Sequence, residues 1–188
     1  MNFDLWRPLT LTAALISSRK PAGGPGAAPS PLSRLLLPLL VLPWALPVLA
    51  GNWPAWRGPL GTGIGDETNL PVKWSPTENV KWRTPLPEAG NSTPVVWQGR
   101  IFVTQAVADR RTLQCFDRTA GRLLWQQGVT TQAKEPTYPS NPYCSGSPVT
   151  DGERVIASFA SDGLFGFDLD GRELWRRTDL GRQIHIWG

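Results

Sequence analysis

Thr93-Pro-Val-Val-Trp-Gln-Gly-Arg-Ile-Phe-Val103 returns further along the chain as Ser147-Pro-Val-Thr-Asp-Gly-Glu-Arg-Val-Ile-Ala157. Each copy begins with a small hydroxyl residue and Pro-Val, passes through a turn that contains Gly, and enters a second β-prone run. We therefore expect two short strands joined by a turn in each copy. Chance does not easily give this matched order, so the pattern indicates a repeated unit rather than two unrelated hairpins.

The second half of each copy repeats as well. Phe116-Asp117, Gly121-Arg122 and Leu124-Trp125 return in the same order as Phe167-Asp168, Gly171-Arg172 and Leu174-Trp175. The Asp can accept hydrogen bonds from backbone amides in a turn where Gly takes a positive φ. The closing Trp offers a large flat surface to the neighbouring unit. A unit of about 50 residues with four short strands has the size of one β-propeller blade.

The rest of residues 51–188 fits the same architecture. From Leu70 onward, short runs rich in Val, Ile, Phe, Trp and Thr alternate with turn residues, and no window from Gly51 to Gly188 keeps an apolar helical spacing. We predict an all-β chain, a partial β-propeller with four-stranded antiparallel blades at 93–127 and 147–178. An irregular arm and an N-terminal outer strand are expected at 51–92. An immunoglobulin-like sandwich is the main alternative, but it requires no internal repeat, and the Cys-Trp-Cys pattern is absent.

Residues 1–50 are expected to form a leader. An uncharged run of sixteen residues from Leu35 to Ala50 follows Arg34, which is the layout of a secretory signal peptide, and we predict cleavage after Ala50. The alternative is an uncleaved membrane anchor that would leave a tethered sensor domain. However, the run is shorter than the about 20 residues that cross a bilayer. A periplasmic or secreted location is therefore expected.

The net charge of +4 does not indicate a nucleic-acid-binding protein. The leader carries four cationic residues against one acidic residue, so residues 51–188 hold only +1. A basic surface that follows phosphates is not expected, and we predict no nucleic-acid partner.

The chain has two cysteines, Cys115 and Cys144, and one histidine, His185. In an oxidising compartment the two cysteines could form one disulfide. The other interpretation is two small, semi-buried strand residues. Two thiols and one imidazole without close spacing do not make a metal-ligand set, and a lone His does not make a catalytic triad. We predict no catalytic, cofactor-binding or metal-binding residue.

Cys115-Phe-Asp-Arg-Thr-Ala-Gly-Arg-Leu-Leu-Trp125 resembles the tryptophan-docking motif of the pyrroloquinoline-quinone (PQQ) repeat family, Ala-x-Asp-x-x-Thr-Gly-Lys-x-x-Trp. Asp117, Gly121 and Trp125 match the motif, and Arg122 replaces its Lys, whereas Cys115 and Ala120 depart from it. The stretch 166–175 resembles the same motif with one turn residue deleted and supplies Asp168, Gly171, Arg172 and Trp175. The resemblance implies that these residues join blades and that neither Trp holds a quinone.

The resemblance implies a propeller but leaves its activity open, because the family holds both protein-binding propellers and quinoprotein dehydrogenases. We expect an exported, non-catalytic protein-binding or scaffold module without a cofactor. Its partner is an unknown protein, with contacts expected in the loop Lys134–Tyr143, and the alternative is that this loop is a rigid connector between blades. The rival hypothesis is the N-terminal part of an alcohol or sugar dehydrogenase that depends on PQQ and Ca²⁺.

Two blades are too few for a closed ring, which takes about four to eight. We therefore expect an N-terminal fragment, with the remaining blades of the same propeller downstream of Gly188. Asn79–Pro87 has the pattern of the outer strand that completes a last blade. Without further blades, the apolar faces of the terminal blades would be exposed.

Overall fold

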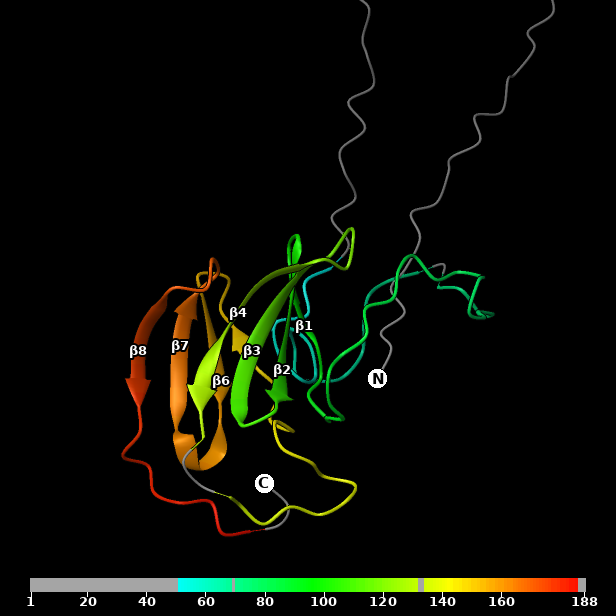
Figure 1. Cartoon of the computed structure of the whole chain (residues 1–188). Helices are drawn as coiled ribbons and strands as arrows, with labels where there is room; N and C mark the ends of the chain where they lie inside the picture. Colours follow the sequence, from blue (N-terminus) through cyan, green and yellow to red (C-terminus); the bar gives the residue numbers. More distant parts are fainter. Residues whose placement is uncertain (1–50, 69, 132–133, 186–188) are drawn as a thin grey trace, which may run out of the picture. The chain divides into compact units, whose positions relative to one another are not determined.

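The computed structural model describes residues 51–68, 70–131 and 134–185, all of which lie in one compact unit. The expected leader and its cleavage site lie outside the described residues. Two antiparallel sheets and one short 3₁₀ turn make up the regular structure of the described part (Figure 1), which confirms the all-β prediction. In the same part of the chain, no helix is long and apolar enough to span a membrane.

The first sheet has four strands in sequence order. They are β1 (Val95–Trp97), β2 (Arg100–Val107), β3 (Arg110–Asp117) and β4 (Leu123–Thr130). The β1–β2 turn falls at Gln98-Gly99, as the repeat predicts. A β-bulge in the β3–β4 pairing lies between Cys115 and Phe116, just before the turn that starts at Asp117.

The second sheet repeats this order with shorter strands. They are β5 (Val149–Thr150), β6 (Arg154–Ser158), β7 (Leu164–Asp168) and β8 (Glu173–Arg177), and a 3₁₀ turn at Ala160–Asp162 joins β6 to β7. The bulge recurs between Gly166 and Phe167, again two strand residues before the turn aspartate. The repeated turn chemistry therefore gives two sheets with the same strand order and irregularity.

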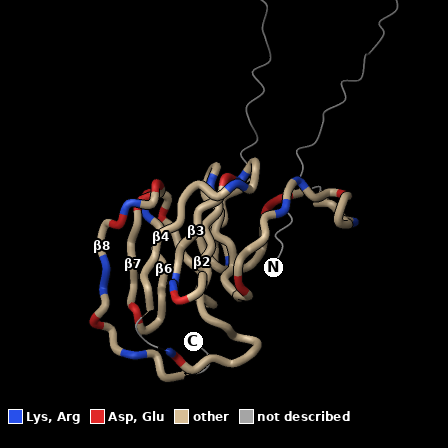
Figure 2. Tube along the Cα trace, viewed as in Figure 1, with Lys and Arg blue, Asp and Glu red and all other residues tan. Residues whose placement is uncertain are grey.

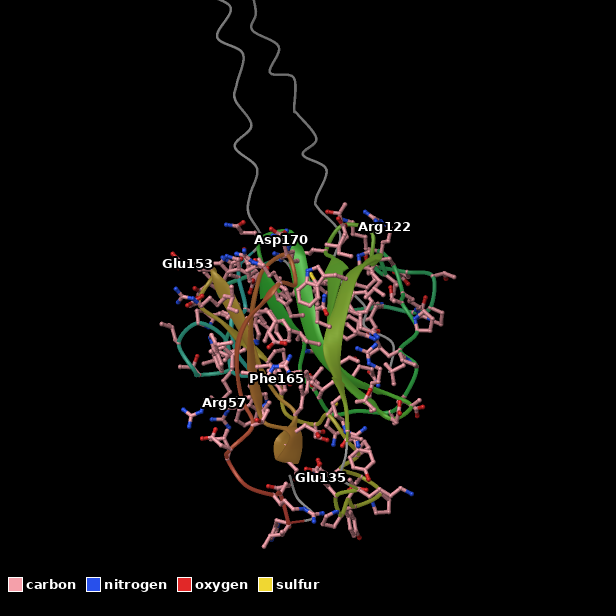
Figure 3. All side chains as sticks on the ribbon, turned by 60° about the vertical axis from the view of Figure 1, so that its left-hand side comes forward. Arg57, Arg122, Glu135, Glu153, Phe165 and Asp170 are labelled. Atoms are coloured by element: carbon pink, nitrogen blue, oxygen red, sulfur yellow. The ribbon has the colours of Figure 1, made fainter. Side chains whose placement is uncertain are left out.

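The main core lies between the two sheets. One face of the first sheet contributes Val95, Phe102, Leu113 and Cys115, and the facing side of the second contributes Val155, Ala157, Phe165 and Phe167, all at most 1% exposed. Phe165, labelled in Figure 3, lies inside this layer. Close packing of these apolar groups fixes one sheet against the other.

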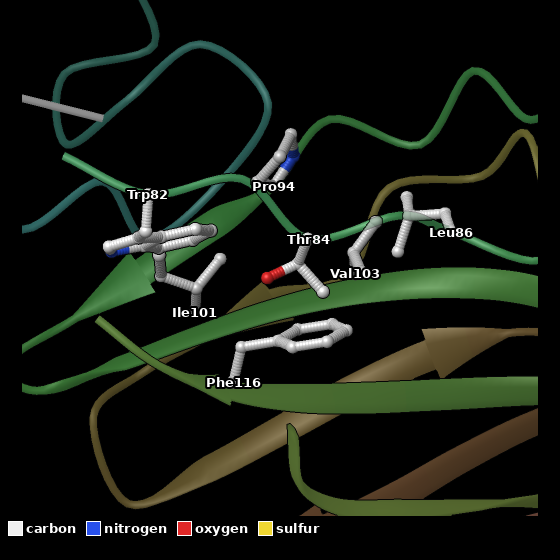
Figure 4. Close-up of a pocket in the computed structure, with 7 residues that line it drawn as sticks. All are labelled: Trp82, Thr84, Leu86, Pro94, Ile101, Val103 and Phe116. Carbon is white, nitrogen blue, oxygen red and sulfur yellow. The ribbon is translucent and has the colours of Figure 1, made fainter. Parts of the chain in front are cut away.

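The opposite face of the first sheet is covered by the segment that precedes it. Ile101, Val103 and Phe116 are buried there, and Trp82 and Leu86 pack against them. Figure 4 shows this layer around a cavity of about 20 Å³. Because both faces of the sheet are covered, six consecutive residues in each of β2 and β3 are buried.

This covering segment includes Asn79–Pro87, where an outer strand was expected, and it pairs with no strand of the described part. Residues 79–94 lie in no strand of the described structure. Trp82, Thr84 and Leu86 are half-buried while Lys81, Arg83 and Pro85 are exposed, so the period of two that suggested a strand is present. The segment thus has the side-chain alternation of a strand without a ladder partner.

Charged residues are mostly kept out of the core. Figure 2 shows them mainly in the turns and along β8, where all five residues are exposed. The arm at the start of the described part joins the sheet by backbone hydrogen bonds between Trp53 and Val96, at 2.7 and 2.9 Å. The polar turns therefore lie at the ends of the sheets, where another segment of the chain can pack on them.

Candidate functional site

The turn after β3 is built on Asp117. Its Oδ1 atom accepts hydrogen bonds from the amides of Thr119 (2.8 Å) and Ala120 (2.7 Å), and the amide of Gly121 donates to its carbonyl oxygen at 2.8 Å. Gly121 has a φ of +69°, which most side chains disfavour. Arg122 is exposed at the edge of this turn. The turn therefore has the hydrogen bonds that the Asp–Gly pattern predicts.

The turn after β7 repeats the arrangement with one residue fewer. Asp168 Oδ1 accepts hydrogen bonds from the amides of Asp170 (3.1 Å) and Arg172 (2.8 Å), while the Arg172 guanidinium contacts Oδ2 at 3.1 Å. The amide hydrogen bond from Arg172 is the main reason why the pKa of Asp168 lies below its usual value. Gly171 has a φ of +88°. Both Asp residues thus shape the turns in which they lie.

Trp125 docks on the second of these turns. Its Nε1 donates to the carbonyl oxygen of Leu169 at 3.0 Å, and its indole lies against Gly171, where an added Cβ would come within 2.7 Å of Cδ2. The ring centroids of Phe102 and Phe167 are 5.9 and 6.4 Å away. The last strand of one sheet is therefore attached to the turn of the next sheet through its Trp.

Trp82 docks on the first turn in the same way. Its Nε1 donates to the carbonyl oxygen of Arg118 at 3.0 Å, and its ring lies over Gly121. Arg118 follows Asp117 just as Leu169 follows Asp168, so the two indoles occupy equivalent positions. Thr84 adds a hydrogen bond from Oγ1 to the carbonyl oxygen of Gly121 at 2.6 Å.

Sequence reasoning expected an outer strand around Trp82 but gave this Trp no docking role. The signal was present: Trp82 and Leu86 have the same four-residue spacing as Trp125 and Val129, and all four pack on a sheet face. The covering segment 80–86 is therefore equivalent to β4 in its docking contacts.

Trp175 is the third indole of the series, and no described turn lies over it. It covers Gly166 of its own sheet, and 38% of its surface is exposed. Arg172, three residues earlier in the motif, forms an ion pair with Asp168 of its own turn. Of the predicted docking residues, the structure thus brings Trp125 and Gly171 together across two sheets, whereas Trp175 has no such partner in the described part.

The face around Trp175 can be compared position by position with its covered counterpart. In the first sheet Val95, Phe102, Cys115 and Trp125 are paired across the strands and lie against the second sheet. The register-equivalent positions in the second sheet are Val149, Ile156, Gly166 and Trp175. Val95 is fully buried, whereas Val149 is 43% exposed. The outward face of β5–β8 therefore has the composition of a docking face without a cover.

The cysteines are not joined. Cys115 and Cys144 are free thiols, both buried in the layer between the sheets, so the disulfide that the sequence allowed is not formed. Burial raises the pKa of Cys115 to about 12 and that of Cys144 to about 11. They pack as small apolar residues.

A second cavity lies under the loop in which the sequence predicted partner contacts. Its volume is about 160 Å³, and Glu135, Tyr143, Cys144, Arg111 and His185 contribute to its lining. Figure 3 shows Glu135 beside the 3₁₀ turn, at the opposite end of the sheets from Arg122 and Asp170. This cavity is therefore separate from the docking turns.

The described residues do not fit a PQQ–calcium centre. Trp125 packs against Phe102, Phe167 and Gly171 and is used in the contact between the two sheets. Within residues 51–68, 70–131 and 134–185, no group of three or more His, Cys, Asp or Glu side chains could hold a metal ion. We derive no chemical step through that cofactor.

Two sheets of identical strand order, joined by a Trp on a Gly turn, define consecutive blades of a β-propeller. A family profile described as outer membrane protein assembly factor BamB matches residues 62–184. The chain belongs to this family of PQQ-like repeat β-propeller proteins.

Among solved structures, the chain is similar to BamB from Moraxella catarrhalis, with 16% identity and a TM-score of 0.40 over 53% of this chain and 27% of that one. It is also similar to a europium-containing methanol dehydrogenase, with 16% identity and a TM-score of 0.38 over 53% of this chain and 19% of that one. The match thus spans 27% of the length of the first neighbour and 19% of the length of the second. A comparison with curated proteins found no match.

Proposed function

We propose that this chain is part of an exported, non-catalytic scaffold or protein-binding β-propeller, and that the outward face of β5–β8 holds the next blade. The observation that carries the proposal is the register equivalence between this face and the face of β1–β4 that holds the second sheet. The same positions carry apolar or small residues in both sheets, and in the second sheet Val149 and Trp175 are 43% and 38% exposed.

The occupant that fits this face is a further PQQ-like blade. The face of β1–β4 is covered by one sheet side rich in Val, Ala and Phe, together with a turn closed by Gly171. A blade with the same features would bury Val149 and cover Trp175, which are 43% and 38% exposed. Removing that apolar surface from water favours association. We infer that this blade belongs to the same propeller, so the present chain is an incomplete N-terminal part of it.

The experiment adds a further blade that can pack on the outward face of β5–β8. A copy of residues 142–178 is appended after Gly188, which gives a connector of the same length as that between Thr130 and Val149. We expect the Trp175 indole N–H to become protected from hydrogen exchange, because the added turn supplies its acceptor. The control carries Gly171→Val in the added copy only, which blocks the turn where an indole must lie. Equal exchange at Trp175 in the parent, extended and control chains would refute the docking role.

The dehydrogenase hypothesis is tested separately. The full chain and its extended form are mixed with PQQ and Ca²⁺, and dye-linked oxidation of alcohols and sugars is measured. The proposal expects no turnover above that of PQQ and Ca²⁺ alone. Protein-dependent turnover would contradict a non-catalytic role even if the added blade docks.

A further inference from the structure

Arg111, at the start of β3, is an arginine buried inside the protein. Only 4% of its surface is exposed, and its guanidinium carbon lies 3.8 Å from the centre of the Tyr143 ring. Its position in β3 alternates with Leu113 and Cys115, so it lies on the sheet face that meets the second sheet. The sequence analysis gave this residue no role.

The Arg111 guanidinium has no acceptor among the described residues. Other arginines of this part of the chain form ion pairs near the surface, such as Arg100 with Asp170 and Arg176 with Glu173. For Arg111 the stack on Tyr143 is the contact of its head group, and no hydrogen bond or ion pair from it is present in the described part. A buried cation is stable only when its charge and its N–H groups are matched. The stack gives the N–H groups no acceptor. They are not fully enclosed, because Gln114 Oε1 is the single fully buried, unpartnered side-chain polar atom of the described part.

The unmatched group lines the cavity of about 160 Å³. Several further polar residues surround the same space: Asn141, Ser145, Ser158 and Gln183. A water molecule takes about 30 Å³ in the liquid, so the space has room for a small polar group of several atoms. The cavity therefore combines a fixed cation, polar walls and enough volume for a ligand group.

The acidic groups around the cavity limit the charge of that ligand. Glu135 lines it and accepts a hydrogen bond at Oε1 from the amide of Ser161 at 2.6 Å, and Asp162 lies close enough to act on the Cys144 thiol. The remaining titratable group in the lining besides the Cys144 thiol and the Tyr143 phenol is His185. One guanidinium beside two acidic side chains disfavours a doubly charged phosphate more strongly than a singly charged group, because the repulsion grows with the charge of the ligand. A planar, singly charged group with two oxygens matches the fork of Arg111.

We propose that this cavity binds a carboxylate group, held by the Arg111 guanidinium beside the Tyr143 ring. The carboxylate can come from a small free acid or from an acidic side chain of a peptide, and both present the same two oxygens. The site lies at the opposite end of the sheets from the docking turns, so it is independent of the proposed blade docking.

The test measures thermal stability of the full chain in sodium acetate and in sodium chloride of the same ionic strength. Sodium phosphate is the third arm. Two capped tripeptides, one with a central Asp and one with a central Asn, separate a peptide source from a free acid. We expect acetate or the Asp peptide to raise the melting temperature above chloride, and the stronger of the two identifies the source. No rise with either, or a larger rise with phosphate, would overturn the proposal.

Arg111→Met supplies the decisive variant because it keeps the length of the side chain and removes the unmatched charge. We expect it to weaken carboxylate binding by about tenfold or more, while the ligand-free protein melts no lower than the wild type. Arg110→Gln is the matched control on the neighbouring, half-exposed position and should keep the acetate effect. Loss of fold in Arg111→Met, or an unchanged acetate effect, would assign Arg111 a structural role and contradict the site.

Discussion

Trp125→Ala is predicted to destabilise the protein far more than Trp175→Ala. The Trp125 indole loses its packing on Phe102, Phe167 and Gly171 and its hydrogen bond to Leu169. Large aromatic truncations in cores cost about 3–5 kcal/mol, and because Trp125 is half-buried we expect about 3 kcal/mol. Trp175 contacts mainly its own sheet and is 38% exposed, so its loss should cost about 1 kcal/mol.

The assay is urea unfolding of the full chain followed by far-UV circular dichroism, since tryptophan fluorescence changes with the substitutions themselves. Trp82→Ala should resemble Trp125→Ala, because its indole makes the equivalent hydrogen bond to Arg118. Equal losses for Trp125→Ala and Trp175→Ala would refute the argument that docking on the next turn, rather than packing within a sheet, gives these residues their importance.

Gly171→Ala should destabilise the protein by about 2 kcal/mol or more, because it adds a clash with Trp125 to an unfavourable φ. Gly61→Ala, with a φ of +68° and open space around it, should cost about 1 kcal/mol. Urea midpoints of both variants measure the difference, and equal midpoints would exclude the clash. Asp117→Ala should lower stability by about 1 kcal/mol through loss of two amide hydrogen bonds, and Asp117→Asn should restore most of it; equal losses in the two variants would argue against the turn hydrogen bonds. Both thiols hold their protons more tightly in the folded chain, with a pKa of about 12 for Cys115 and about 11 for Cys144 against an ordinary 9.0. Their contribution to stability is therefore present below pH 9 and is lost as the pH rises toward 12. The fall in urea midpoint between pH 8 and pH 11 should be smaller in a Cys115→Ala, Cys144→Ala variant than in the wild type, and an identical fall in both would contradict it.

The repeat made the fold predictable. The Thr/Ser-Pro-Val runs, the turn Asp residues and the closing Trp each mark a local feature that depends on a few neighbouring residues, and two copies in one order indicate a blade. The outer strand expected at Asn79–Pro87 has no ladder in the described part for a physical reason. A period of two shows which side chains face a neighbouring surface, but a strand also needs a hydrogen-bonded partner, and none is among the described residues.

The candidate sites were harder to predict because they depend on contacts between distant parts of the chain. Arg111 looks like any strand-terminal arginine until the loop that carries Tyr143 covers it. The docking role of Trp82 required the position of a turn 39 residues away at Gly121. The exposed face around Trp175 is recognised as a docking face only from the strand register of β5–β8, which matches that of β1–β4.

The most direct test of the account is hydrogen exchange at the tryptophan indole N–H groups of the full chain, resolved by NMR. The account predicts slow exchange at Trp82 and Trp125, whose Nε1 atoms donate to the carbonyl oxygens of Arg118 and Leu169, and fast exchange at Trp175. Slow exchange at Trp175, or fast exchange at Trp82 and Trp125, would contradict the claim that two docked blades present a third, uncovered docking face.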